Sequence, residues 1–151
     1  MNETKCAAQI VQSARNWIGT PYLHQASLKG AGCDCLGLIR GVWRETQGAE
    51  PTPPPVYSSS WAEFSREEKL LQAAHKFFIP RNSRDFEPGD ILLFRMKPGS
   101  IAKHLGIAAT DKSFVHAYDK NAVTESALAD FWKKRIVAAF QFPKAADEVH
   151  F

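Results

Sequence analysis

The first part of the chain carries hydrophobic side chains at every third or fourth position, which is the spacing of an amphipathic helix. Between residues 7 and 18 these positions are Ala7, Ile10, Val11, Ala14, Trp17 and Ile18. Gly19 and Pro21 come next, and both residue types are common just beyond a helix end. The same spacing predicts a second helix from Cys35 to about Thr46, with apolar side chains at Leu38, Ile39, Val42 and Trp43.

A third helix is expected after a stretch rich in proline and serine, residues 48–61, which we expect to run extended over the surface. Ser65 and Glu68 form a capping box at the start of this helix. Its apolar side chains are Leu70, Leu71, Ala74, Phe77 and Phe78. His75 lies away from these positions, so we interpret it as an exposed surface residue.

After Asp90 the pattern changes to short runs that favour strands. These runs are ILLFR, KHLGIAA, SFVHAY, AVTES and RIVAAFQF, between residues 91 and 142. Helices followed by strands with short links predict an α+β domain, in which N-terminal helices pack on an antiparallel β-sheet of about five strands. We expect residues 1–151 to form one domain, with residues 143–151 as a loose tail.

Composition and charge restrict the class of protein. The chain has 151 residues, of which 44% are hydrophobic and 23% charged, and this composition is typical of a globular domain with a core. The formal net charge is +3, but the Lys and Arg residues are dispersed, which does not favour a nucleic-acid partner.

The N-terminal sequence MNETKCAAQI lacks the apolar core of a secretory signal, and no apolar run reaches the roughly 20 residues of a membrane span. We therefore expect synthesis in the cytoplasm without a signal peptide. The three cysteines should remain reduced in that compartment.

Two of the cysteines, Cys33 and Cys35, stand in the segment GAGCDCLGL. If Asp34 caps the second helix, a rotation of about 100° per residue places Cys35 in the middle of the buried face. The opposite side then carries Gly37, Arg40 and Arg44. A thiol in the first helical turn is close to the positive end of the helix dipole and to unbonded N–H groups, which should lower its pKa and can hold an oxyanion. The same position also suits a small core residue.

Two histidines in the expected strands are candidate bases for such a thiol. Strand alternation places His104 on one face with Gly106 and Ala108, so that another element can approach closely. If a three-residue loop around Asp111 joins the two strands, His104 and His116 become opposite or diagonal neighbours on one face. A different loop length would separate them, and either residue alone could be a structural histidine. A first-turn cysteine with two histidines on one face provides the nucleophile, the base and the orienting group that a cysteine hydrolase uses.

The segments GTPYLHQASLKGAGCDCLGLIRGVW, PGDILLF, KHLGI and FVHA resemble the NlpC/P60 family of papain-like cell-wall peptidases, in particular its phage cell wall peptidase subgroup. The resemblance extends from Ile10 to Phe142. It implies a papain-like fold, with Cys35 as nucleophile, His104 as base and His116 as the residue that orients the base. Two departures from the family pattern are Leu36 in place of a serine and HQAS in place of a Gly-Gly pair.

The resemblance also implies a reaction and a setting. The substrate would be a peptide bond of a peptidoglycan stem peptide, usually the D-γ-glutamyl to diamino-acid link, and no cofactor is expected. Phage tail or gene-transfer particle proteins are expected partners beside peptidoglycan fragments. Lysis or particle delivery would then bring the enzyme to the cell wall.

Three residues near the expected nucleophile are candidate substrate-binding residues. Tyr22 matches a family tyrosine that lines the catalytic cleft, Asp34 precedes the nucleophile, and His24 lies in the loop before it. A positive mouth of the site is expected to attract an anionic substrate. Its members would be His24, Lys29, Arg95, Lys97 and Lys103.

Three alternatives remain open from the sequence. Cys33, Cys35, His104 and His116 have the ligand types of a zinc site, although the Cys-x-Cys spacing is tighter than usual. An acyltransferase on the same scaffold would use the same nucleophile and base. A non-catalytic wall-binding or particle-assembly module would need neither.

Overall fold

A computed structural model describes residues 3–51, 68–118 and 120–143 of the chain. Ser65, most of the proline-rich stretch and almost all of the expected tail lie outside these residues. The helices are α1 (Glu3–Arg15), α2 (Cys35–Thr46), α4 (Lys69–Phe77) and the short α5 (Asp130–Lys133). The described residues also contain one 3₁₀ turn, η1 (Ser83–Asp85).

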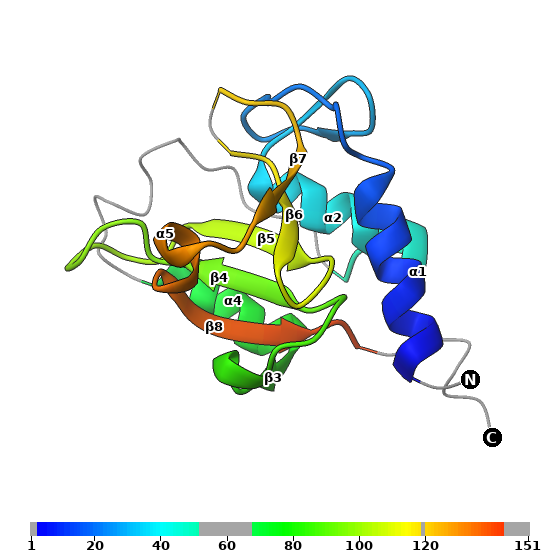
Figure 1. Cartoon of the computed structure of the whole chain (residues 1–151). Coiled ribbons are helices and arrows are strands. Elements are labelled where there is room, and N and C mark those ends of the chain that lie inside the picture. Colours follow the sequence, from blue (N-terminus) through cyan, green and yellow to red (C-terminus); the bar gives the residue numbers. More distant parts are fainter. Residues whose placement is uncertain (1–2, 52–67, 119, 144–151) are drawn as a thin grey trace.

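The main sheet has six strands, all antiparallel to their neighbours, in the order β3-β8-β4-β5-β6-β7 (Figure 1). Their bounds are β3 Ile79–Arg81, β4 Ile91–Phe94, β5 His104–Ala108, β6 Ser113–His116, β7 Thr124–Ala127 and β8 Ile136–Gln141. The predicted α+β class is confirmed. The sequence pattern missed β3, a three-residue edge strand that contains a proline.

The sheet has a core on each face. On one face, side chains from α1, α2 and α4 pack on odd-numbered strand residues such as Leu93, Leu105 and Ile107. On the other face, Trp132 of α5 packs with Phe94 and Phe114. Every residue of β5 is buried, because this strand has a core on both sides.

The first helix ends earlier than its apolar pattern predicts. The N–H of Ile18 donates to the carbonyl of Arg15, so the chain leaves the helix in tight turns. As a result Trp17 is 1% exposed, whereas Ile18 is 45% exposed instead of lying in the core. The expectation for His75 is confirmed, since it is exposed, although its ring edge meets Phe140 at a centroid distance of 5.1 Å.

A small second sheet lies just before α2. It pairs β1 (Ser27–Leu28) with β2 (Gly32–Cys33). The hydroxyl of Ser27 donates to the carbonyl of Gly37 at 2.6 Å, which ties this hairpin to the first turn of α2.

Within the described ranges, no helix combines the length and the apolarity that crossing a membrane requires.

Candidate active site

The first turn of α2 is fixed by Asp34, which caps it as predicted. One oxygen of the Asp34 carboxylate, Oδ1, accepts the N–H of Gly37 at 2.7 Å. The other, Oδ2, accepts the N–H of Gln25 at 2.8 Å and lies 3.8 Å from Nδ1 of His24. The side chain therefore joins the preceding loop to the helix start.

Gly37 was expected on the solvent side of α2, and this expectation is wrong. A Cβ atom at Gly37 would come within 1.9 Å of the carbonyl oxygen of Ala26. The loop before β1 therefore covers this side of the helix, and only glycine leaves room for it.

Cys35 lies between the helix start and β5. Its Sγ is 3.7 Å from the carbonyl oxygen of Lys103, and the N–H of Leu105 also bonds to the sulfur. The thiol therefore touches the backbone on both sides of His104. The residue is half-buried and packs against the core between the helices and the sheet, in agreement with its predicted place on the buried face of α2.

The pKa of the Cys35 thiol is raised to about 12, which contradicts the lowered value expected from its position. Removal of the sulfur from water is the main cause, and the negative charge of Asp34 acts in the same direction. The N–H groups of Cys35 and Leu36 at the helix start do lower the pKa, but by less. The resting group is therefore a thiol.

Cys33 has a different environment. Its side chain is 0% exposed and belongs to the core between the helices and the sheet. Burial raises the pKa of this thiol to about 12 as well. Of the two neighbouring thiols, Cys35 is the one whose sulfur contacts the carbonyl of Lys103, next to His104.

His104 and His116 are joined directly. The Nε2 atom of His104 lies 2.9 Å from Nδ1 of His116, and the ring centroids are 5.1 Å apart. The N–H of Ala109 donates to the carbonyl of Ser113, which leaves a three-residue loop around Asp111. The pairing of Ile107 with Val115 then makes the two histidines diagonal neighbours, as predicted.

Ser126 extends this pair. The Nε2 atom of His116 lies 2.9 Å from Oγ of Ser126 on β7. Strand pairing places Ser126 opposite Phe114, so its side chain is diagonal to His116 on the same face. The sequence pattern did not point to Ser126, because the connection between β6 and β7 is too long for the register of β7 to be inferred.

Aromatic side chains surround the two imidazoles. The Trp132 ring lies 5.6 Å from His104 and 5.0 Å from His116, measured between centroids, and Tyr118 lies 5.2 Å from His104. Phe94 lies 5.6 Å from His104, and Phe114 lies 4.1 Å from His116. Trp132 was not expected here, since no sequence pattern places α5 over this face.

Burial makes this histidine pair neutral. It lowers the pKa of His104 to about 3, with a further contribution from His116, and the pKa of His116 to about 4. His104 is 6% exposed and His116 is 2% exposed. At neutral pH the site therefore holds a thiol and two neutral imidazoles.

The candidate substrate-binding residues Tyr22, His24 and Asp34 gather near the start of α2. Tyr22 forms a bridge with Cys33, and the N–H of Leu23 bonds to the Cys33 carbonyl, so their loop runs beside β2. The imidazole of His24 is partly exposed, whereas Asp34 is buried and uses both carboxylate oxygens within the protein. A role of these residues in substrate binding stays a prediction.

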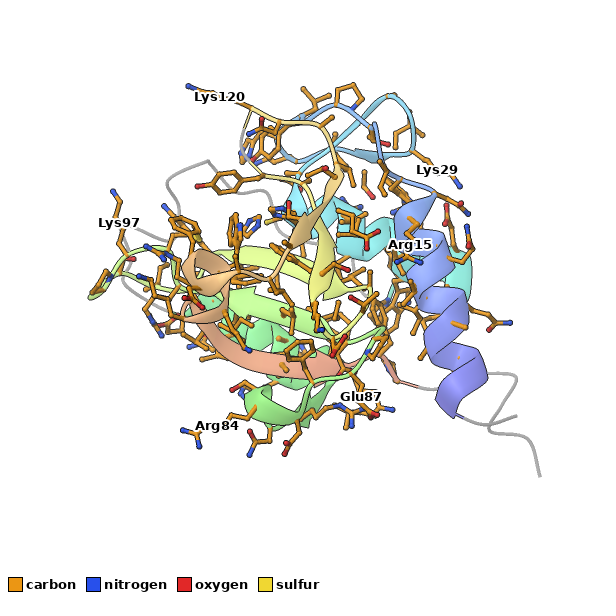
Figure 2. The ribbon with its side chains drawn as sticks, viewed as in Figure 1. Arg15, Lys29, Arg84, Glu87, Lys97 and Lys120 are labelled. Carbon is orange, nitrogen blue, oxygen red and sulfur yellow. The ribbon has the colours of Figure 1, made fainter. Side chains whose placement is uncertain are left out.

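The basic residues expected at the mouth do not form one group. Arg95 pairs with Glu68 at 2.7 Å, and Lys29 pairs with Glu45 at 2.8 Å. Figure 2 shows Lys29 and Lys97 on opposite sides of the molecule, with Lys97 pointing outward. The expectation of a single positive mouth is therefore wrong.

The arrangement does not favour the zinc site. Nε2 of His104 and Nδ1 of His116 bond to each other, and Cys33 lies in the core. Among residues 3–51, 68–118 and 120–143, no three His, Cys, Asp or Glu side chains are grouped as a metal site requires.

Comparison with curated proteins finds relatives that are longer than this chain. The gamma-DL-glutamyl hydrolase of Bacillus subtilis (strain 168) is 28% identical over 134 residues, which cover 88% of this chain and 29% of that protein. The murein DD-endopeptidase MepS/murein LD-carboxypeptidase of Escherichia coli (strain K12) is 31% identical over 129 residues, which cover 85% of this chain and 58% of that protein. The chain thus spans less than two thirds of either relative.

Solved structures share the fold. The NlpC/P60 domain of the peptidoglycan hydrolase SagA superimposes with a TM-score of 0.66 at 22% identity, covering 90% of this chain and 98% of that domain. The peptidoglycan hydrolase RipB of Mycobacterium tuberculosis gives a TM-score of 0.62 at 13% identity, covering 95% of this chain and 69% of that one. The NlpC/P60 family model matches residues 19–141. The chain belongs to the NlpC/P60 family.

Proposed function

We propose that this protein is a cysteine peptidase that hydrolyses a peptide bond in peptidoglycan stem peptides. The observation that carries the proposal is a thiol held against the carbonyl of Lys103, the residue before His104, whose imidazole is bonded to a second buried histidine. Family membership supports the reaction class, since two relatives are named as a hydrolase and an endopeptidase.

In this proposal each nitrogen of His104 has a separate task. His104 uses Nε2 for His116, so Nδ1 is the atom that accepts the proton of the Cys35 thiol. Because the thiol pKa is high, proton transfer accompanies the attack of sulfur on the substrate carbonyl. The protonated His104 then donates to the leaving amine, and water hydrolyses the thioester.

The start of α2 supplies donors for the oxyanion. The N–H groups of Gly37 and Leu38 are already bonded to Asp34. Those of Cys35 and Leu36 lie at the sulfur itself. We assign these two groups to the negative oxygen that forms when sulfur adds to the carbonyl.

For the bond that is cut, we propose the D-γ-glutamyl to diamino-acid link. The name of the Bacillus subtilis relative, a gamma-DL-glutamyl hydrolase, supports a γ-glutamyl substrate. We propose action at the cell wall after lysis or delivery by a phage or gene-transfer particle, on the motif resemblance alone.

Digestion of purified peptidoglycan tests the proposal. Product masses should show stem peptides that end at D-glutamate, with new free amines on the diamino acid. Cys35→Ala is the matched control and should give no products. Transfer of the acyl group to an added amine, without hydrolysis, would instead identify an acyltransferase, and intact peptidoglycan would favour a binding module.

A further inference from the structure

We propose that Ser126 is a positioning residue that fixes the tautomer of the His104–His116 pair by accepting a hydrogen bond from Nε2 of His116. This inference rests on the proposed function, because its catalytic consequence needs His104 to act as the base. The hydroxyl of Ser126 bonds to Nε2 of His116, whereas His104 bonds to Nδ1 of the same ring. Ser126 would therefore affect the reaction through both imidazoles.

The chain of hydrogen bonds has only two consistent directions when both histidines are neutral. In the first, Nε2–H of His104 donates to His116, and Nε2–H of His116 donates to Oγ of Ser126. In the second, the Ser126 hydroxyl donates, both bonds reverse, and Nδ1 of His104 carries the proton. Only the first direction leaves Nδ1 of His104 able to accept the thiol proton.

The same direction is required after proton transfer. When His104 becomes an imidazolium, it still donates through Nε2 to Nδ1 of His116, and His116 still donates to Ser126. No hydrogen bond has to reverse during the reaction, provided that Ser126 remains an acceptor. This is the electrostatic preorganisation that an enzyme site needs.

Burial makes Ser126 important for this direction. His116 is 2% exposed, so water cannot readily replace the hydroxyl at its Nε2 atom. A buried N–H without a partner is costly, and loss of the serine would therefore favour the tautomer in which Nε2 of His116 carries no proton. That tautomer is the one that blocks His104 as a base.

The neighbouring hydroxyl of Ser113 does not share this task. It donates to Glu125 at 2.7 Å, and Glu125 pairs with Arg15 at 2.9 Å. Val115, which is opposite Glu125 in the sheet, belongs to the core against the helices, whereas Ser126 points to the face that carries the histidines. The charged cluster is therefore separate from the histidine pair.

Nitrogen-15 NMR of the labelled wild-type protein tests the tautomer directly. In the pH range where both rings are neutral, His104 and His116 should each carry their proton on Nε2. In Ser126→Ala the fraction of His116 protonated on Nδ1 should rise. A wild-type His104 protonated on Nδ1 would overturn the proposal without any variant.

Kinetics test the consequence. Ser126→Ala should lower kcat roughly tenfold with little change in KM, because one buried hydrogen bond is lost. Ser126→Thr keeps a hydroxyl and should retain most activity. If the alanine variant folds poorly, the threonine variant still tests whether a hydroxyl at this position supports activity. Thr124→Val, which removes an exposed hydroxyl from the same strand, should behave as wild type.

The outcomes separate this inference from the proposed function. A wild-type protein that leaves peptidoglycan intact contradicts the function, while the NMR result still decides the tautomer. Hydrolysis with unchanged kcat in Ser126→Ala, or equal losses in Ser126→Ala and Thr124→Val, overturns the role of Ser126.

Discussion

Nε2 of His104 and Nδ1 of His116 are 2.9 Å apart, with Trp132 beside both rings. Two histidines so close would repel each other if both were charged, and burial already disfavours either charge. The two rings are therefore neutral, and in the hydrogen bond between them one ring is the donor and the other is the acceptor. One ring can take a proton from a nearby thiol only if the other is correctly oriented.

The two thiols should differ in their effect on activity. Cys35→Ser should abolish hydrolysis, since a serine hydroxyl is a far weaker nucleophile without a strong base. Cys33→Ser should retain the kcat of the folded enzyme but lose about 1–3 kcal/mol of stability, because it buries a hydroxyl in an apolar core. Peptidoglycan digestion and urea unfolding measure these effects. Equal loss of activity in both folded variants, with zinc in the wild type, would revive the metal site.

The two histidines should also differ. His104→Ala should lose about 10²–10⁴ in kcat, the contribution of general acid–base catalysis. His116→Asn should be milder, because the amide oxygen can still accept a hydrogen bond from Nε2 of His104. Steady-state kinetics with a stem-peptide substrate compare the variants. A greater loss in folded His116→Asn would reverse the assigned roles.

Local patterns explain why the histidine pair could be predicted from the sequence. Strand alternation fixes the face of His104, and a three-residue loop keeps residues of equal parity on one face. The prediction therefore depended on one short hairpin, which the structure contains. The helix cap at Asp34 could be predicted for the same reason, because it depends on residues that are close together in the sequence.

Interactions between distant segments could not be predicted in this way. β8 is the last strand of the described residues, yet it lies between β3 and β4, and it brings the preceding α5 with Trp132 over the histidines. The register of Ser126 depends on the longer connection after His116. The pKa of Cys35 depends on a balance between burial and helix-start N–H groups, and the sequence shows only the second.

Stability should rise with pH between about pH 4 and 6.5 through the histidine pair. The pKa values of His104 and His116 fall to about 3 and about 4 on folding, so the unfolded chain binds more protons in this window. At pH 5 each neutral imidazole costs about 2 kcal/mol of stability relative to pH 7. Urea unfolding at several pH values measures the slope.

A double variant, His104→Gln with His116→Gln, isolates this effect. Asp90 acts in the opposite direction, because burial raises its pKa to about 6 and favours the folded state at low pH. It is present in both proteins, so the difference between their slopes reports the histidines alone. Identical slopes would contradict the lowered pKa values.

Gly106→Ala should disturb the histidine pair by crowding it. A Cβ atom there would lie 2.7 Å from the Phe114 ring and 3.3 Å from Cβ of His116. Overpacking of this kind costs about 1–3 kcal/mol, and the displaced ring should lower kcat. Gly32→Ala controls for crowding alone, because its Cβ would also lie 2.7 Å from a side-chain atom, Cβ of Leu23, but in the small β1–β2 sheet and not beside the histidines. Equal effects on kcat would mean that the clash at Gly106 does not reach the site.

Alkylation by neutral iodoacetamide tests the resting state of Cys35. Because burial raises its pKa to about 12, the thiolate is rare at pH 7, and the alkylation rate should rise about tenfold per pH unit from pH 7 to 9. Mass spectrometry of the modified peptide separates Cys35 from Cys6, and Cys35→Ser gives the background. A rapid rate that is constant from pH 5 to 8 would instead indicate a thiolate–imidazolium pair. In that case His104 would already hold the proton before substrate binds, and its low pKa would be wrong.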